Sequence, residues 1–213
     1  MTNYYDTKRM FITFEGLDGS GKTTQATLLV HRLSALGREV MFLREPGGTT
    51  VSEKIRAILL DKQHLELRQK TELLLFSAAR AQLVEDVIRP ALRSGKVVIC
   101  DRFYDSTTAY QGYGRKLNLD EIRSINTLAT SGTTPDLTVL VDVELDELRR
   151  RRHSAGIVDD RMESSGVEFY QRVRGGYLAM TVAEPKRIIL INGMRPVEEI
   201  HNEIWSIVQQ RFF

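Results

Sequence analysis

The stretch MFITFEGLDGSGKTT, residues 10–24, decides most of the fold. Residues 10–15 are mostly apolar and predict a short buried strand. A glycine-rich turn follows, and a helical pattern then runs over about 22–36 before Gly37, a residue type that commonly ends helices. A strand that leads through such a turn into a helix predicts the first βα unit of a parallel sheet.

The same alternation continues to the end of the chain. Further strands are predicted at 40–43, 97–100, 137–143 and 187–191, and further helices at 51–60, 69–93, 118–131, 145–153, about 167–183 and 197–211. Alternation of this kind implies right-handed crossovers, and therefore an α/β fold in which helices cover both faces of a five-stranded parallel sheet. We find no linker or repeat, so residues 1–213 are expected to form a single domain, with 1–9 as a loose tail.

Composition excludes several classes of protein. The 213 residues are 42% hydrophobic and 27% charged, which suits a globular protein with a real core. Thirty basic and 28 acidic residues leave a net charge of +2, so we expect no nucleic-acid partner. No apolar run approaches the roughly 20 residues of a membrane-spanning helix, and the first ten residues lack a signal-peptide pattern, so a cytoplasmic location is expected. Cys100 is the only cysteine, which excludes an intrachain disulfide.

The turn GLDGSGKT, residues 16–23, fits the pattern GxxxxGK[ST], and its strand–turn–helix context favours a phosphate-binding loop over a chance glycine-rich turn. Glycines let backbone N–H groups turn toward phosphate oxygens, and the helix start presents its positive dipole end. Lys22 would neutralise the β- and γ-phosphates, and the Thr23 hydroxyl can bind Mg²⁺. This motif predicts nucleoside triphosphate binding, but it is shared by kinases, GTPase switches and motor ATPases.

Two further segments lie where predicted strands end. Asp101 follows the strand at 97–100, and Arg102 comes next. A carboxylate at this edge suits a metal-ordering role, and an Asp–Arg pair also suits a structural salt bridge; the position favours a ligand site because open α/β sheets bind ligands there. The segment REPGGT, residues 44–49, ends at the same edge and is equally compatible with a plain turn.

Two helical segments carry side chains suited to nucleotides. Phe76 and Arg80 are four residues apart and share a helix face, where they could stack on and hydrogen-bond a planar base, or serve as a core aromatic and an exposed arginine. The run Arg149–Arg152 points to all sides of a helix, so it cannot form one binding stripe. It is either a solvated face or the start of a lid at about 149–165 that supplies positive charge to a transferring phosphoryl group.

Taken together, these segments resemble the thymidylate kinase family. The resemblance rests on FEGLDGSGKTT (14–24), REPGGT (44–49), FSAAR (76–80), DRF (101–103), the S…AYQG pattern (106–112), TPDLT (134–138) and DRME (160–163). The family implies a P-loop αβα fold, transfer of the γ-phosphoryl of ATP to dTMP to give dTDP, Mg²⁺ as cofactor, and a homodimer. The combination of REPGGT, DRF and AYQG is far more specific than the phosphate loop.

The resemblance also implies a role for each matching residue. ATP phosphates would bind Gly16, Leu17, Asp18, Gly19, Ser20, Gly21, Lys22, Thr23 and Thr24, and Mg²⁺ would bind Thr23 and Asp101. The dTMP site would comprise Asp18, Glu45, Pro46, Arg56, Phe76, Arg80, Arg102, Thr107, Tyr110 and Gln111. Within it, Arg56 and Arg102 would clamp the acceptor phosphate. Phe76 would stack on thymine, and Arg80, Thr107 and Gln111 would read the base edge. Tyr110 would crowd the 2′ position of the sugar.

The catalytic set is expected to contain Lys22, Asp18, Arg102 and a lid arginine. Some family members carry a catalytic arginine within the phosphate loop, where this chain has Gly19, so the lid is expected to supply it. Arg150 and Arg152 are the leading candidates, followed by Arg161 in the same segment. One position of the family's spaced lid arginines matches Ser154, which leaves the register open.

Two rival functions remain at this stage. A deoxynucleoside kinase would accept a neutral hydroxyl group, and it would need no arginine clamp for an acceptor phosphate. A nucleotide-dependent switch without transfer activity would leave the predicted base-site residues unexplained. The guanine-reading NKxD tetrapeptide does not occur in the sequence.

Overall fold

A computed structural model of the chain describes residues 9–64, 66–154 and 166–213. Its five strands are β1 (Phe11–Glu15), β2 (Val40–Arg44), β3 (Val97–Asp101), β4 (Leu137–Asp142) and β5 (Ile188–Asn192). All are parallel, in the order β2-β3-β1-β4-β5. The predicted five-stranded parallel sheet is confirmed, and each predicted strand lies within two residues of its observed bounds.

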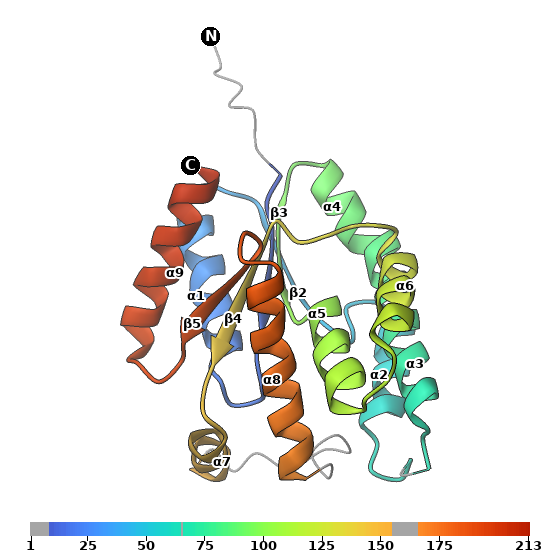
Figure 1. Cartoon of the computed structure of the whole chain (residues 1–213). Coiled ribbons are helices and arrows are strands. Elements are labelled where there is room, and N and C mark those ends of the chain that lie inside the picture. Colours follow the sequence, from blue (N-terminus) through green and yellow to red (C-terminus); the bar gives the residue numbers. More distant parts are fainter. Residues whose placement is uncertain (1–8, 65, 155–165) are drawn as a thin grey trace.

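Helices lie on both faces of this sheet (Figure 1). They are α1 (Lys22–Ala35), α2 (Thr50–Leu60), α3 (Gln69–Leu83), α4 (Arg89–Arg93), α5 (Tyr104–Thr107), α6 (Leu119–Thr130), α7 (Leu145–Ser154), α8 (Val167–Ala183) and α9 (Val197–Phe212), with two π-helical turns, η1 (Val84–Ile88) and η2 (Thr108–Gly114). Local sequence explains several ends. Gly37 closes α1 in a left-handed conformation, and the Thr49 and Asn118 side chains cap α2 and α6.

The period-two alternation of the strands divides the core between the two faces. In β1, Ile12 and Phe14 pack with α1 and α9, in a cluster that includes Leu29 and Trp205. Phe11 belongs to a separate cluster on the other face, with buried residues of α3, η1 and β3. Since side chains alternate along a strand, Glu15 at the end of β1 emerges on the face of Phe11. A carboxylate is thus placed inside a helix-covered layer.

Two helical regions differ from the predictions. The single helix expected at 69–93 contains the π-turn η1 between α3 and α4, so it is helical throughout but not regular. No element was expected at 104–114, where α5 and η2 form a short helical segment. This segment is rich in Thr, Ser and Gly, which are weak helix formers, so tertiary packing rather than propensity determines it. π-turns of this kind often occur at functional sites.

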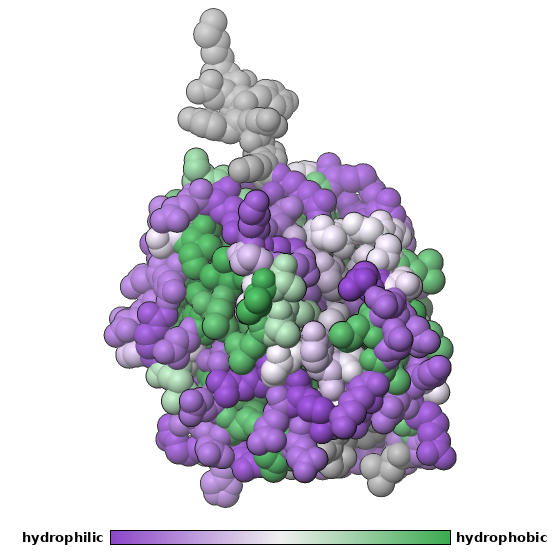
Figure 2. Space-filling model, viewed as in Figure 1, coloured by the Kyte–Doolittle hydropathy of each residue, from purple (hydrophilic) through white to green (hydrophobic). Residues whose placement is uncertain are grey.

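Two sequence expectations fall partly outside the described residues. Residues 1–8 of the expected tail and 155–165 of the expected lid lie outside them. Arg9 is described, and its guanidinium forms an ion pair with Asp136 at 3.5 Å. Hydrophilic residues cover most of the face shown in Figure 2, and a smaller hydrophobic area lies between α9 and α8. Across the described ranges, we find no helix long and apolar enough to cross a membrane.

Candidate functional site

The carboxyl ends of β1, β2 and β3 meet at one edge of the sheet. Asp101 is in register with Phe14 on one side and with Arg44 on the other. The turns that follow these strands therefore begin side by side. This brings the phosphate-loop motif, the REPGGT segment and the Asp101–Arg102 pair together, as the sequence predicted from strand ends alone.

The turn between β1 and α1 has the backbone of a phosphate-binding loop. Gly16, Gly19 and Gly21 have φ angles of 137°, 89° and 92°, in the region that favours glycine. A Cβ on Gly16 would lie 2.4 Å from the carbonyl oxygen of Val141, so this position also requires a close backbone approach. The first turn of α1 has no side-chain cap and no acidic residue. Its N–H groups and positive dipole end are thus available to an anion.

Two cations converge on one carboxylate oxygen beside this loop. Asp18 Oδ1 accepts hydrogen bonds from Lys22 Nζ at 3.0 Å and from Arg102 Nη2 at 2.7 Å. Desolvation would raise the pKa of the Asp18 carboxyl, but the charges and hydrogen bonds of Arg102 and Lys22 outweigh it and hold that pKa well below its usual value. Asp18 is therefore ionised at neutral pH, and it holds both cations at the mouth of the loop.

A pair of oxygen ligands suited to Mg²⁺ lies at the same place. The hydroxyl group of Thr23 donates a hydrogen bond to Asp101 Oδ2, so the two predicted metal ligands are in direct contact. Mg²⁺ prefers hard oxygen ligands and commonly takes only one or two from the protein, with the rest from water and substrate phosphates. Among the described residues, we find no group of three or more His, Cys, Asp or Glu side chains that could hold a metal by themselves.

A cavity of about 540 Å³ opens in front of the loop. It is lined by every residue predicted to bind the acceptor, which are Asp18, Glu45, Pro46, Arg56, Phe76, Arg80, Arg102, Thr107, Tyr110 and Gln111, together with Lys22, Thr23 and Thr24 of the loop. Phe76 and Arg80 do share one face of α3, and both line this cavity. Gly19 and Gly21 of the loop also line it, whereas Gly16, Leu17 and Ser20 lie outside the cavity lining.

The wall of this cavity is fixed by a buried ion pair. Arg80 Nε donates to Glu45 Oε2 at 2.8 Å, and both side chains are at most 4% exposed. Burial raises the pKa of the Glu45 carboxyl above its usual value, even though the charge of Arg80 acts in the opposite direction. The peptide bond between Glu45 and Pro46 is cis, and Arg56 Nη1 donates to the carbonyl oxygen of Pro46 at 2.9 Å. Glu45 and Pro46 of the REPGGT segment thus form part of the cavity wall.

Arg102 is held in a left-handed backbone conformation, with φ of 71°. Its guanidinium lies 3.1 Å from Ser106 Oγ and 3.4 Å from the hydroxyl groups of Tyr110 and Tyr177. These contacts, with the ion pair to Asp18, fix the direction in which the guanidinium points. Residues with positive φ other than glycine are uncommon, and they are found disproportionately at functional sites.

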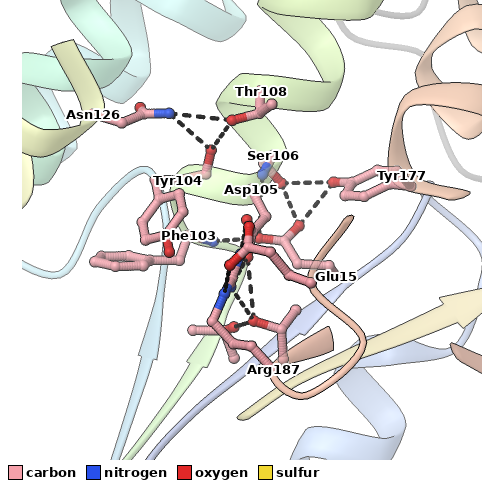
Figure 3. A network of polar contacts seen from close by, with 12 residues as sticks. Glu15, Phe103, Tyr104, Asp105, Ser106, Thr108, Asn126, Tyr177 and Arg187 are labelled. Carbon is pink, nitrogen blue, oxygen red and sulfur yellow. Dashed lines mark hydrogen bonds and ion pairs between the residues drawn. The ribbon is translucent and has the colours of Figure 1, made fainter. Parts of the chain in front are cut away.

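Glu15 lies against the segment that follows Arg102, and Figure 3 shows it with Phe103 and Ser106 of that segment and with Tyr177. Its carboxylate accepts from the backbone N–H of Phe103 at 2.7 Å, from Ser106 Oγ at 2.6 Å and from the Tyr177 hydroxyl at 2.8 Å. Burial, and to a lesser extent the nearby Asp105 carboxylate, raise the pKa of Glu15 to about 7. Glu15 is thus a fully buried acid whose charge is compensated by hydrogen bonds and by Arg102.

The arginines of α7 point in different directions, as the helical geometry predicted. Arg150 is 72% exposed on its side chain and forms an ion pair with Glu147, so the described structure does not bring it to the cavity. Arg151 lines the main cavity and donates to the carbonyl oxygen of Gly193 at 2.9 Å. Arg152 lies against the phosphate loop, because a Cβ on Gly19 would lie 3.3 Å from its Cγ. Arg161 lies outside the described residues.

Several site residues are absent from the set predicted from sequence. Glu15, Ser106 and Tyr177 position Arg102, and Arg151 faces the cavity. Glu15 was detectable in principle, because a charged residue closing an otherwise apolar strand must find buried partners. Tyr177 comes from α8, far along the chain, and no local pattern could have connected it to this turn.

Known proteins that are similar to this chain share one family name. A family model described as thymidylate kinase matches residues 14–204. The chain belongs to the thymidylate kinase family. It is 51% identical over 211 residues to the thymidylate kinase of Pelodictyon phaeoclathratiforme, with 95% of this chain and 97% of the relative covered. It is 47% identical over 200 residues to that of Caldanaerobacter subterraneus, with 94% and 95% covered.

A solved structure carries the same family name. The crystal structure of thymidylate kinase from Ehrlichia chaffeensis superposes on this chain with a TM-score of 0.77 at 38% sequence identity. The superposed region covers 94% of this chain and 98% of the Ehrlichia chain. The expected P-loop αβα fold is thereby confirmed. This thymidylate kinase family member is a transferase of nucleotide biosynthesis that binds ATP.

Proposed function

We propose that the cavity in front of the phosphate loop is where this thymidylate kinase transfers the γ-phosphoryl group of ATP to dTMP, giving dTDP. The observation that carries the proposal is the position of Lys22 and Arg102. Both cations are fixed by Asp18 between the loop on one side and the wall of Phe76 and Arg80 on the other. Two phosphates that approach each other repel, and cations held between them remove that repulsion.

The donor side consists of the loop, residues 16–21, and the start of α1. Its uncapped N–H groups and the Lys22 ammonium bind the ATP phosphates. Thr23 and Asp101 would hold Mg²⁺, which when bound adds positive charge to the phosphates. Arg152 is the lid arginine that we favour for the transferring group, because its side chain lies against the loop, whereas Arg150 is exposed and paired with Glu147.

The acceptor side begins with Arg102 and Arg56, which bind the phosphate of dTMP. Phe76 stacks on the base beside Pro46, with Arg80, Thr107 and Gln111 at the base edge. Tyr110 limits the space at the 2′ position of the sugar, and its hydroxyl group is 3.4 Å from the Arg102 guanidinium. These roles are supported by the shared cavity, which all of these side chains line.

The proposal is tested by ADP release from Mg-ATP with dTMP, dUMP, dCMP, UMP, thymidine or no acceptor. Strong turnover with dTMP, weaker turnover with dUMP and none with thymidine is expected. Equal turnover with thymidine would indicate a deoxynucleoside kinase and would remove the roles of Arg56 and Arg102. An Arg56→Met variant separates the two cases, because only a phosphate acceptor should lose affinity. ADP release that does not depend on an acceptor would point to a nucleotide-dependent switch.

We further propose that the enzyme is a homodimer that works in the cytoplasm, where ATP and dTMP are both present. Support for the dimer comes from exposed apolar side chains on adjacent helices, with Leu74 of α3 57% exposed and Leu128 of α6 81% exposed. Light scattering of the wild type and of Leu128→Glu tests this. A monomeric wild type would contradict it.

A further inference from the structure

The stripe of α3 that faces the cavity continues beyond Phe76 and Arg80. Glu72 lies one helical turn before Phe76, on the same face, and it is only 1% exposed. Its carboxylate contacts the segment opposite, where η2 ends. Glu72 Oε1 accepts from Gln111 Nε2 at 3.0 Å, and both of its oxygens accept from Arg115, at 3.2 and 3.3 Å. The buried Glu72 carboxylate is therefore hydrogen-bonded directly to Gln111, a residue of the proposed base site.

The carboxylate determines which way the Gln111 amide points. A carboxylate has only acceptors, so the amide must present its NH₂ group to Glu72, and the opposite orientation would bring two acceptors together. Gln111 is itself 1% exposed and lines the cavity. Within the described residues, no protein donor bonds to its Oε1. The amide oxygen is thus left as a fixed acceptor at the cavity.

Arg115 keeps this arrangement rigid. Its guanidinium supplies the positive charge that a buried carboxylate requires, and it lies 4.6 Å from the centre of the Phe169 ring of α8. Glu72 is therefore held from one side by Arg115, while Gln111 is held by Glu72. An amide without such a partner could rotate and offer either a donor or an acceptor to a ligand.

We propose that Glu72 is a positioning residue for base selection, which fixes the amide oxygen of Gln111 toward the ligand so that the site requires an N–H group at N3 of the pyrimidine. The inference rests on the proposed placement of the base beside Phe76 and Gln111. Thymine and uracil carry a hydrogen on N3 and an oxygen at C4, which suit an acceptor at Gln111 and the donors of Arg80. Cytosine has a lone pair on N3 and an amino group at C4, so it meets like groups at both places.

The test compares kcat/KM for dUMP and dCMP, which both lack the methyl group and differ only at this edge of the base. Glu72→Gln replaces the acceptor-only carboxylate with an amide that can rotate, so Gln111 can rotate as well. The preference for dUMP over dCMP is expected to fall by about tenfold or more, which corresponds to the loss of one properly paired hydrogen bond. The preference for dTMP over dUMP should not change, because both bases have the same edge.

Two controls separate positioning from general structural damage. In a Gln111→Ala background, Glu72→Gln should have no further effect on the dUMP to dCMP ratio, although it can still lower the melting temperature. Glu72→Asp keeps an acceptor-only group and should retain more of the ratio than Glu72→Gln. A ratio within twofold of the wild type in folded Glu72→Gln would overturn the inference, and so would an equal fall in the Gln111→Ala background. Absence of dTMP turnover in the wild type would instead contradict the proposed function.

Discussion

Replacing Arg102 with Met should remove the main positive charge at the acceptor phosphate. The guanidinium is held by Asp18 and by contacts with Ser106 and two tyrosines, so its direction is set before a substrate binds. Two unit charges about 4 Å apart at an effective dielectric constant of about 20 interact with about 4 kcal/mol. At about 1.4 kcal/mol per factor of ten, kcat/KM for dTMP should fall about a thousandfold.

The assay is ADP release at saturating Mg-ATP over a range of dTMP concentrations. Arg102→Lys keeps the charge but loses the forked geometry, so an intermediate loss is expected. Arg123→Met is the matched control, because Arg123 is 78% exposed on α6 and forms an ion pair with the exposed Asp120. A folded Arg102→Met enzyme whose kcat/KM stays within tenfold of the wild type would refute the assignment of the phosphate to this arginine.

Three other predictions concern the network beneath the site and the base. Because the folded pKa of Glu15 is raised to about 7, the native state binds more protons than the unfolded state between about pH 4.5 and 7, and stability should fall by about 3 kcal/mol as the pH rises through that range. Urea midpoints of the wild type and Glu15→Gln at several pH values should show a flatter profile for the variant, and parallel profiles would contradict this. In the wild type, Arg187 donates to the buried Asp105 carboxylate at 2.7 and 2.9 Å, and Arg187→Met leaves that carboxylate without its cation. The free energy of unfolding should therefore fall by about 3–5 kcal/mol, and the melting temperature by roughly 6–20 °C. An unchanged calorimetric midpoint would exclude a stabilising pair. Phe76→Ala should raise the KM for dTMP about 5- to 150-fold through lost stacking while kcat changes less, and steady-state kinetics that show the reverse would argue against a stacked base.

The sequence carries the fold and most of the site because both depend on local patterns. Apolar runs of five residues, the glycines of the loop and the positions just after strands 97–100 and 40–43 can be recognised without knowledge of distant contacts. Register then brings Asp101 and Arg44 to the same level, which is a consequence of parallel pairing. The residues of the candidate site that follow directly after a strand could therefore be predicted from the sequence.

The remaining features depend on contacts between distant segments. The helical segment at 104–114 has weak helix formers and is held by packing against α8 and α6. The partnership of Glu72 with Arg115, and of Glu15 with Tyr177, joins residues that are 43 and 162 positions apart. Likewise, the run of four arginines at 149–152 does not indicate in which direction each side chain points. Only the packed helix shows that Arg152 approaches the loop and that Arg150 faces solvent.

The shared carboxylate of Asp18 gives the enzyme its own counterion. The single carboxylate offsets one of the two positive charges of Lys22 and Arg102, so the pair attracts chloride or phosphate from solution less strongly than two unpaired cations would. A substrate phosphate must compete with this internal anion, which weakens binding of simple inorganic anions more than that of a nucleotide held also through its base. Discrimination against bulk anions thus follows from one shared oxygen atom.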